Sequence, residues 1–394
     1  MKKTNHVAWS CDKWILLNTL AILFVGLLMV SSASMVISDR RFGFPFYYLL
    51  RQGVYVAAGL VCAWLMTGVP IRLWQRYSGY LMLAGLVLLV LVLIPGIGNV
   101  VNGSRRWIHV GFISLQVTEL VKVFTIIYVA DFLVRHQERI RRHFLGAFNL
   151  IVLLGVMALL LLLEPDFGTF VVITFTLMTL LFLAGVRLGP FIILLVLASI
   201  ALAGLAIMAP YRLERLTTFL NPWADQYGAG YQLTQSLIAF GRGGIFGVGL
   251  GNSVQKLFYL PEAHTDFIFA VISEELGFIG ALLIIALYVS LITRIFIVGQ
   301  RAKRNGQPYS AYLAFGIGLW IGFQALVNMG VSTGVLPTKG LTLPFISYGG
   351  SSVMVTCVAI AFVMRVAYET EFHDERLPPS SRRNRNILQG RKKA

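Results

Sequence analysis

The sequence has little charge and few cysteines, and both scarcities limit what the protein can be. Only 13% of its 394 residues are charged and 57% are hydrophobic, whereas about a quarter of a soluble globular domain is charged. The three cysteines, Cys11, Cys62 and Cys357, lie in the N-terminal tail or inside apolar runs. We therefore expect neither a soluble globule nor a framework of disulfides or thiolate metal ligands.

The common nucleotide-binding motifs are also missing. No G-x-x-x-x-G-K-[ST] is present, and the glycines of residues 240–253 (FGRGGIFGVGLGNS) lack both the G-x-G-x-x-G spacing and a βαβ context. These glycines form either a flexible turn or a close backbone approach to a ligand, and the residues alone leave both readings open. The Ser351–Ser352 pair has no His–acid partner near it in the sequence, so we reject a nucleophile there.

Long apolar runs, in contrast, are abundant. Crossing a bilayer takes about 20 residues as a helix, and ten runs approach or exceed that length. Because lipid offers no partner for a free backbone amide or carbonyl, each run must be helical. We predict an all-α, polytopic integral membrane bundle. Its expected helices span residues 14–37, 47–68, 77–95, 113–134, 147–163, 168–185, 189–208, 267–298, 310–336 and 346–368.

The charges that do occur are mostly basic, and their positions set the expected topology. The formal net charge is +16, but Lys and Arg gather in segments 135–143, 301–304 and 382–393, which a cytoplasmic N-terminus would place inside. This positive-inside bias explains the charge without a nucleic-acid partner. The expected parts are a cytoplasmic tail (1–13), a membrane domain (14–368) and a basic cytoplasmic tail (369–394) whose partner would be either membrane lipids or a cytoplasmic protein.

The longest interruption, residues 209–266, lies between the expected seventh and eighth helices, on the outer side in this topology. It is rich in glycine, polar and aromatic residues, so we expect it to be ordered and functional. Within it, segments 211–220 and 231–240 have the pattern of short interfacial helices.

Several charged side chains interrupt the apolar pattern. Glu119 and Lys122, three residues apart on one helical face, predict an internal ion pair, or alternatively a charge that lines a cavity. Arg105 and Arg106 (NGSRRWIHVG) at the outer face are either interfacial anchors or phosphate ligands. Glu164 with Asp166 (LEPDFGTF) should lie in a tight outer turn.

Two further breaks concern the last three helices. The segment 336–352 (LPTKGLTLPFISYGGSS) has Lys339 as its only charge and must line protein or water. In residues 260–277 (LPEAHTDFIFAVISEELG), Asp266 is expected at the start of the eighth helix, as an N-cap or as an ionised general base at a cavity mouth. Glu274 and Glu275 are expected inside that helix, supporting it and its neighbours. From these residues alone, a transporter and a membrane enzyme remain open.

Four segments carry a resemblance to a known family. Residues 103–108 (GSRRWI), 164–169 (EPDFGT), 221–277 and 336–352 resemble motifs of the SEDS family of bacterial shape, elongation, division and sporulation proteins. The resemblance covers nearly the whole chain, and it is stronger to the division branch than to the elongation branch.

The resemblance implies a peptidoglycan glycosyltransferase in the bacterial inner membrane at the division septum. Its substrate would be lipid II, the undecaprenyl-pyrophosphate-linked disaccharide peptide. Its partners would be a class B penicillin-binding protein transpeptidase and other divisome proteins. Asp266 matches the family's essential aspartate and would act as general base, with inversion at the anomeric carbon of N-acetylmuramic acid. The alternatives are a lipid II flippase, an elongation polymerase of the same family and a structural divisome scaffold.

A departing pyrophosphate needs positive countercharge. Bound Mg²⁺ or Mn²⁺ beside Asp266 is one source, although no ligand cluster in the sequence requires it. The other source is a set of basic residues near the expected site: Arg105, Arg106, Arg242, Lys256, Lys339 and, next to Asp266, His264.

Overall fold

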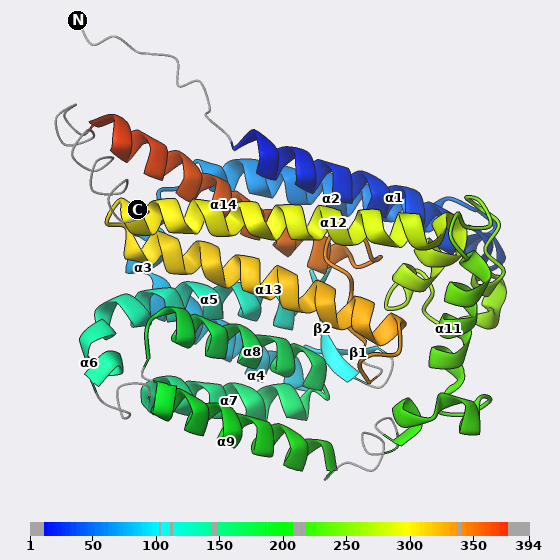
Figure 1. Cartoon of the computed structure of the whole chain (residues 1–394), viewed down its shortest axis with the longest axis horizontal. Coiled ribbons are helices and arrows are strands. Elements are labelled where there is room, and N and C mark those ends of the chain that lie inside the picture. The colour runs from blue at the N-terminus through cyan, green and yellow to red at the C-terminus, as the bar shows by residue number, and fades with distance from the viewer. Residues whose placement is uncertain are drawn as a thin grey trace, which may run out of the picture.

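The computed structural model describes residues 12–101, 104–110, 113–142, 148–186, 188–207, 214, 217–337 and 340–376. It confirms the predicted all-α membrane bundle (Figure 1), with a helix in each expected run. The ten helices are α1 (Lys13–Phe42), α2 (Tyr47–Thr67), α4 (Ser78–Leu93), α5 (Val117–Arg135), α7 (Phe148–Leu163), α8 (Phe167–Leu183), α9 (Leu188–Ile207), α12 (Ile268–Arg304), α13 (Pro308–Ser332) and α14 (Gly350–Arg376).

Five of these helices, α1, α2, α12, α13 and α14, are long and apolar enough to cross a membrane. Helices α4, α7 and α8, and the stretch Phe191–Ile200 of α9, are apolar but shorter. The most central helix is α13, which packs against α12, α5, α8 and α14. Polar side chains on α13 can therefore contact several parts of the bundle at once.

The connections of the bundle fall at two ends (Figure 1). One end, hereafter the sheet end, carries strands β1 (Asn99–Val101), β2 (Ser104–Val110) and β3 (Ile113–Gln116) together with α11 (Tyr231–Gly243). The opposite end carries α3 (Ile71–Arg76) and α6 (Gln137–Arg142), and we refer to it as the terminal end because α1 begins there and α14 ends there.

The small sheet is a departure from the prediction, which placed 113–116 in the fourth helix. Strands β1, β2 and β3 form an antiparallel sheet in that order, with Trp107 opposite Gln116. The sequence carried a signal for it, because Asn102–Gly103 between β-branched and aromatic residues is typical of a hairpin. Helix α5 begins only at Val117.

The long connection between α9 and α12 is ordered where it is described. It contains η2 (Pro222–Asp225), α11 and η3 (Gln255–Tyr259). Helix α11 confirms the helix predicted at 231–240. Half of the helix predicted at 211–220 lies outside the described residues, and its described residues, 214 and 217–220, are helical.

Helix α12 is broken at Gly277, where φ is 69° and ψ is −168°. A Cβ atom there would lie 2.3 Å from Gly247 N, so this crossing requires glycine. The break corrects the straight helix expected over 267–298. It separates a short helix at the sheet end from the long apolar one, so Glu274 and Glu275 precede the long helix instead of lying within it.

Candidate active site

Asp266 lies in the connection that leads into α12, at the sheet end. It is half-buried, and its backbone carbonyl accepts a hydrogen bond of 2.8 Å from Asn328 Nδ2 on α13. The N-cap position of α12 is occupied by Phe267 instead of Asp266. The backbone at Asp266 is therefore fastened to the central helix of the bundle.

The Asp266 carboxylate lies against the backbone of Gly340. A Cβ atom built on Gly340 would lie 2.8 Å from Asp266 Oδ2, closer than real Cβ contacts are found. Asn328 Nδ2 also donates to Leu341 O at 2.6 Å. One amide side chain thus fastens both the Asp266 connection and the segment that the carboxylate touches.

The segment between α13 and α14 is irregular, as predicted for 336–352, and neighbouring helices hold it. Gln324 Nε2 on α13 donates to Thr342 O at 2.9 Å, and Gln52 Nε2 on α2 donates to Ser347 O at 3.2 Å. These bonds supply the protein partners that irregular backbone at membrane depth requires.

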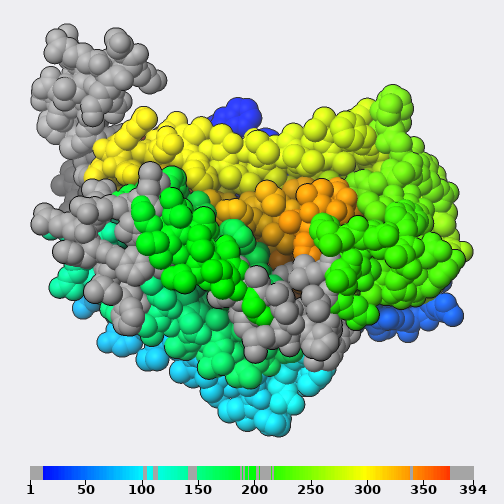
Figure 2. All heavy atoms as spheres, turned by 60° about the horizontal axis from the view of Figure 1, so that its bottom comes forward, coloured from blue at the N-terminus to red at the C-terminus, as the bar shows by residue number. Residues whose placement is uncertain are grey.

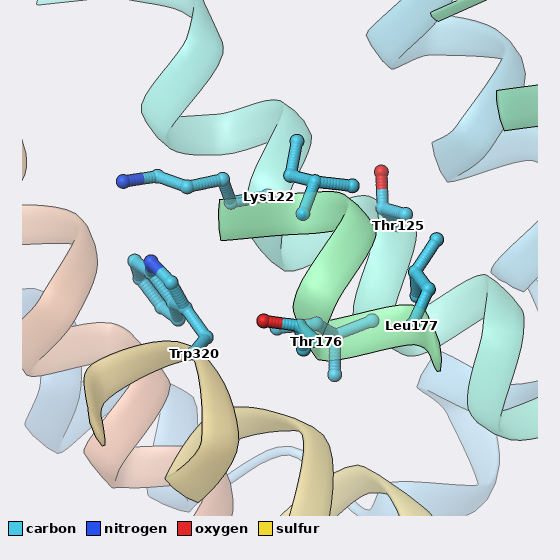
Figure 3. Close-up of a pocket in the computed structure, with 7 residues that line it drawn as sticks. Lys122, Thr125, Thr176, Leu177 and Trp320 are labelled. Carbon is cyan, nitrogen blue, oxygen red and sulfur yellow. The ribbon is translucent and has the colours of Figure 1, made fainter. Parts of the chain in front are cut away.

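Glu119 and Lys122 form a buried ion pair on α5, the arrangement that we favoured from their spacing. Lys122 Nζ lies 2.9 Å from Glu119 Oε1, 2.7 Å from Gln324 Oε1 and 4.9 Å from the Trp320 ring centroid. Figure 3 shows Lys122 and Trp320 on the wall of a cavity of about 10 Å³, which has room for about one water molecule. Through Gln324 and Thr342, the pair buttresses the segment beside the candidate base.

Arg106 on β2 ties the sheet to the turn between α7 and α8. Its Nε donates to Glu164 O at 3.2 Å, its Nη2 donates to Pro165 O at 3.1 Å, and its Nη1 lies 3.7 Å from Asp166 Oδ1. Asp166 in turn caps α8 by accepting from Thr169 N at 3.2 Å. The Arg106 guanidinium is thus directed at this turn.

Glu164 is fully buried, and neither carboxyl oxygen has a hydrogen-bond partner in the described part of the chain. Burial, followed by the nearby charge of Asp166, raises the pKa of Glu164 to about 8, so the group is largely protonated at neutral pH. Directly after this turn, at the start of α8, a Cβ atom on Gly168 would lie 3.1 Å from Leu341 Cγ. The turn therefore packs on the segment that touches Asp266.

Glu274 lies near the end of the short helix, and hydrogen-bond donors occupy both of its carboxylate oxygens. It is 0% exposed and accepts from Ser253 Oγ, from Val254 N at 3.0 Å and from Arg242 Nη1 at 3.3 Å. Ser253 and Val254 lie in the glycine-rich connection after α11, and Arg242 lies in the last turn of α11 itself. Glu274 therefore shapes that connection.

Glu275 is tied in a different direction, because consecutive residues of a helix point about 100° apart. Its carboxylate lies 2.9 Å from Lys256 Nζ and accepts from Ser32 Oγ on α1 at 2.7 Å and from Ser253 N at 3.4 Å. Both Lys256 and Glu275 are buried. The two partners form a structural ion pair between α1, η3 and α12.

The basic residues predicted to bind phosphate are mostly used within the fold. Arg106 and Lys256 form the ion pairs above, and Arg105 Nη1 donates to the carbonyl at the end of α4 at 2.9 Å. Arg242, by contrast, keeps 42% of its side chain exposed beside its glutamate. Lys339 lies outside the described residues.

His264 precedes Asp266 by two residues but packs into an aromatic cluster. Its ring centroid lies 5.1 Å from that of Tyr48 and 5.6 Å from that of Tyr348. Burial lowers the pKa of His264, so the neutral ring is favoured at pH 7. This arrangement suits packing of the connection better than phosphate binding.

Sequence analysis missed the two buried amides of α13, Gln324 and Asn328. They connect the ion pair at Lys122, the segment at 340–342 and the backbone of Asp266. Their signal was available, because two amides four residues apart share one face of an otherwise apolar helix.

Comparison with known proteins places this arrangement in a family. The chain matches the model of a family described as cell cycle protein over residues 13–372. It is 62% identical to the probable peptidoglycan glycosyltransferase FtsW of Coxiella burnetii, over 94% of this chain and 100% of that protein. It is 49% identical to the probable peptidoglycan glycosyltransferase FtsW of Legionella pneumophila, over 93% of each chain.

Solved structures share the fold. A chain from work on structural coordination of polymerization and crosslinking by a peptidoglycan synthase complex superposes with a TM-score of 0.75 at 31% identity, covering 92% of this chain and 98% of that one. The Thermus thermophilus rod shape determining protein RodA gives a TM-score of 0.67 at 27% identity, covering 91% and 97%. The family match, the curated relatives and the shared fold agree, and the chain belongs to the SEDS family of cell cycle proteins.

Proposed function

We propose that the protein is a peptidoglycan glycosyltransferase that polymerises lipid II into glycan strands during cell division, with Asp266 as general base. The observation that carries this proposal is the half-buried Asp266 carboxylate against Gly340, beside the turn at 164–168. The relatives named FtsW support both the reaction class and the division branch over the elongation branch.

In the proposed reaction, the 4-hydroxyl of the acceptor N-acetylglucosamine attacks C1 of the donor N-acetylmuramic acid. The C1–O bond to the polyprenyl pyrophosphate breaks on the opposite face, so the configuration at C1 inverts. Asp266 accepts the hydroxyl proton, which is typically worth a factor of about 10²–10⁴ in rate. The hydrogen bond from Asn328 to the Asp266 backbone and the contact with Gly340 keep the carboxylate positioned before the substrate binds.

The leaving pyrophosphate requires countercharge near Asp266. Arg242, which is partly exposed, and Lys339, which precedes Gly340 in the chain, are the protein candidates that the fold leaves for this role. A bound Mg²⁺ or Mn²⁺ ion would supply the same neutralisation. Within the described ranges, no three His, Cys, Asp or Glu side chains come together as a metal site. Such an ion would therefore combine Asp266 with oxygens of the substrate.

The polyprenyl chain needs an apolar path from this site to the lipid. Figure 2 shows α13 recessed between α12 on one side and α8 and α9 on the other. Leu326 on α13 and Phe175 on α8 are 58% and 44% exposed. We place the polyprenyl chain in this hollow, where it would cover exposed apolar surface.

The proposed setting is the bacterial inner membrane at the septum, with both termini in the cytoplasm and a class B penicillin-binding protein transpeptidase as partner. The structural similarity to a chain of a peptidoglycan synthase complex supports such a partner. For the topology, cysteines placed at Gln226 and Gln389 should differ towards an impermeant thiol reagent on intact cells whose outer membrane is permeabilised. Labelling of Gln389→Cys without labelling of Gln226→Cys would invert the topology.

The reaction itself is tested with purified protein and lipid II, alone and together with the transpeptidase. We expect glycan strands whose formation increases with the partner present. Movement of lipid II across vesicle membranes without any strand formation under either condition would instead favour the flippase.

A further inference from the structure

A second cavity lies at the terminal end of the bundle, between α3, α4 and α5. Its volume is about 800 Å³, and its lining includes Arg72, Arg76 and Arg135. Figure 1 shows α3 at the end opposite the sheet and α11. Pockets for small ligands usually measure about 300–1,000 Å³, and none of the candidate active-site residues that the structure describes lines this one. We call it the arginine cavity.

The arginine cavity carries uncompensated positive charge. Asp131 is the one carboxylate in its described lining, and donors already occupy it: Gln75 Nε2 at 3.1 Å, Ser78 Oγ at 2.7 Å and the guanidinium of Arg135. Arg72 and Arg76 are exposed, and neither has an ion-pair partner among the residues that the structure describes. The guanidinium groups of Arg72 and Arg76 are therefore available to bind an anion.

An apolar stripe on α4 continues from the cavity. Leu83 lines the cavity and is exposed, and Val87, Val90 and Ile94 follow it as exposed residues. Their spacing of three or four residues places them on one helical face. Tyr80, which also lines the cavity, is 72% exposed, and tyrosine is enriched where a membrane meets water. The anion site therefore adjoins a surface suited to an acyl chain.

We propose that the arginine cavity binds the headgroup of an anionic phospholipid, with its phosphate on Arg72 and Arg76 and an acyl chain along the α4 stripe. Guanidinium groups bind phosphate through paired hydrogen bonds. In the proposed topology this end faces the cytoplasmic leaflet, where basic pockets between helices bind anionic headgroups. A soluble phosphate would use the arginines but leave the stripe uncovered. The site is independent of the reaction at Asp266.

The test titrates the full-length purified protein, in phosphatidylcholine nanodiscs, with short-chain phosphatidylglycerol, and follows binding by native mass spectrometry. The double variant Arg72→Gln/Arg76→Gln should bind this lipid about tenfold more weakly, because both phosphate ligands are lost. The control Lys303→Gln/Arg304→Gln removes the same charge from exposed residues at the same end, outside the cavity lining, and should bind as the parent does.

Unchanged affinity in the cavity variant, or an equal loss in the control, would overturn the site. A second titration uses glycerol 1-phosphate, and binding as tight as that of the lipid would overturn the assignment to a lipid. Melting temperatures without added anionic lipid should match the parent, since both arginines are exposed. If the double variant does not fold, the single variants carry the test, each with an expected loss of about threefold.

Discussion

Two acidic sites border the same short helix, Ile268–Leu276, and the fold treats them in opposite ways. Before its start, Asp266 is half-buried, with its backbone held by Asn328 and its carboxylate against a glycine. At its end, Glu274 and Glu275 are 0% and 1% exposed, and amide, hydroxyl and cationic donors surround them.

This difference shows how carboxylates serve chemistry or architecture. A buried acid whose oxygens already accept several hydrogen bonds is closed to a substrate, and removing it would leave those donors unpaired. Such a group organises the chain around it. A base must instead remain accessible while its position is fixed, and here the backbone clamp and close packing on Gly340 fix it. The predictions below test this division of roles.

The largest effect is expected from Glu275→Ala. It leaves the Lys256 ammonium buried without its counterion, and breaking a buried pair in this way costs about 3–5 kcal/mol. The melting temperature of the purified protein should fall strongly. The double variant Lys256→Met/Glu275→Gln should recover much of that loss, because no unpaired charge remains. A normal melting temperature for Glu275→Ala would show that the second site is not architectural.

A loss of about 3 kcal/mol is expected from Lys122→Ala, at the lower end of the range for a buried pair. Glu119 loses its counterion, while Gln324 keeps its bonds to Trp320 and Thr342. The folded yield and melting temperature report this change. A variant of normal stability that binds lipid II poorly would instead place Lys122 in the substrate cavity.

Gly340→Ala tests whether the position of the Asp266 carboxylate matters for the reaction. The added methyl group would lie 2.8 Å from Asp266 Oδ2, so the carboxylate must move, and we expect about a tenfold lower rate of polymerisation with little loss of stability. Gly241→Ala is the matched control, because no described atom outside the adjoining backbone of α11 lies within 4 Å of its Cβ position. Equal rates for the two variants would show that the position of the carboxylate is not critical.

The smallest effect concerns Glu164. Burial raises the pKa of this carboxyl group to about 8. The folded protein keeps a proton on Glu164 that the unfolded chain releases near the ordinary pKa of a glutamate. The stabilisation of the fold by this proton is therefore full below that ordinary pKa. It is lost as the pH rises towards 8. The slope is at most about 1.4 kcal/mol per pH unit. Glu164→Gln should flatten the fall in melting temperature between pH 6 and 8, whereas exposed Glu138→Gln should not. Identical slopes would contradict a protonated Glu164.

The helices could be predicted because lipid forces every apolar run to satisfy its own backbone. The small sheet was missed because its strands are short and lie between two strong helical signals. The break at Gly277 was missed for another reason. A lone glycine is tolerated in a helix, and only the contact with Gly247, thirty residues away, requires its conformation.

The candidate site also has features that the sequence predicts and features that it does not. Asp266 came from its place after a turn and from the family resemblance, and the pairing of Glu119 with Lys122 came from helical spacing. The partners of Asp266 could not be derived, since Asn328 and Gly340 reach it across more than sixty residues of chain. Local sequence also does not distinguish Lys256, which is buried in an ion pair with Glu275, from Arg242, which stays partly exposed.

The central claim is that Asp266 acts in the chemistry, and the rate of lipid II polymerisation by Asp266→Asn tests it most directly. The matched control is Glu262→Gln, which neutralises an exposed carboxylate in the same connection. At equal amounts of folded, membrane-inserted protein, the account predicts a fall of about 10²-fold or more for Asp266→Asn and a near-parental rate for the control. Glycan-strand synthesis by Asp266→Asn at half the parental rate would contradict it.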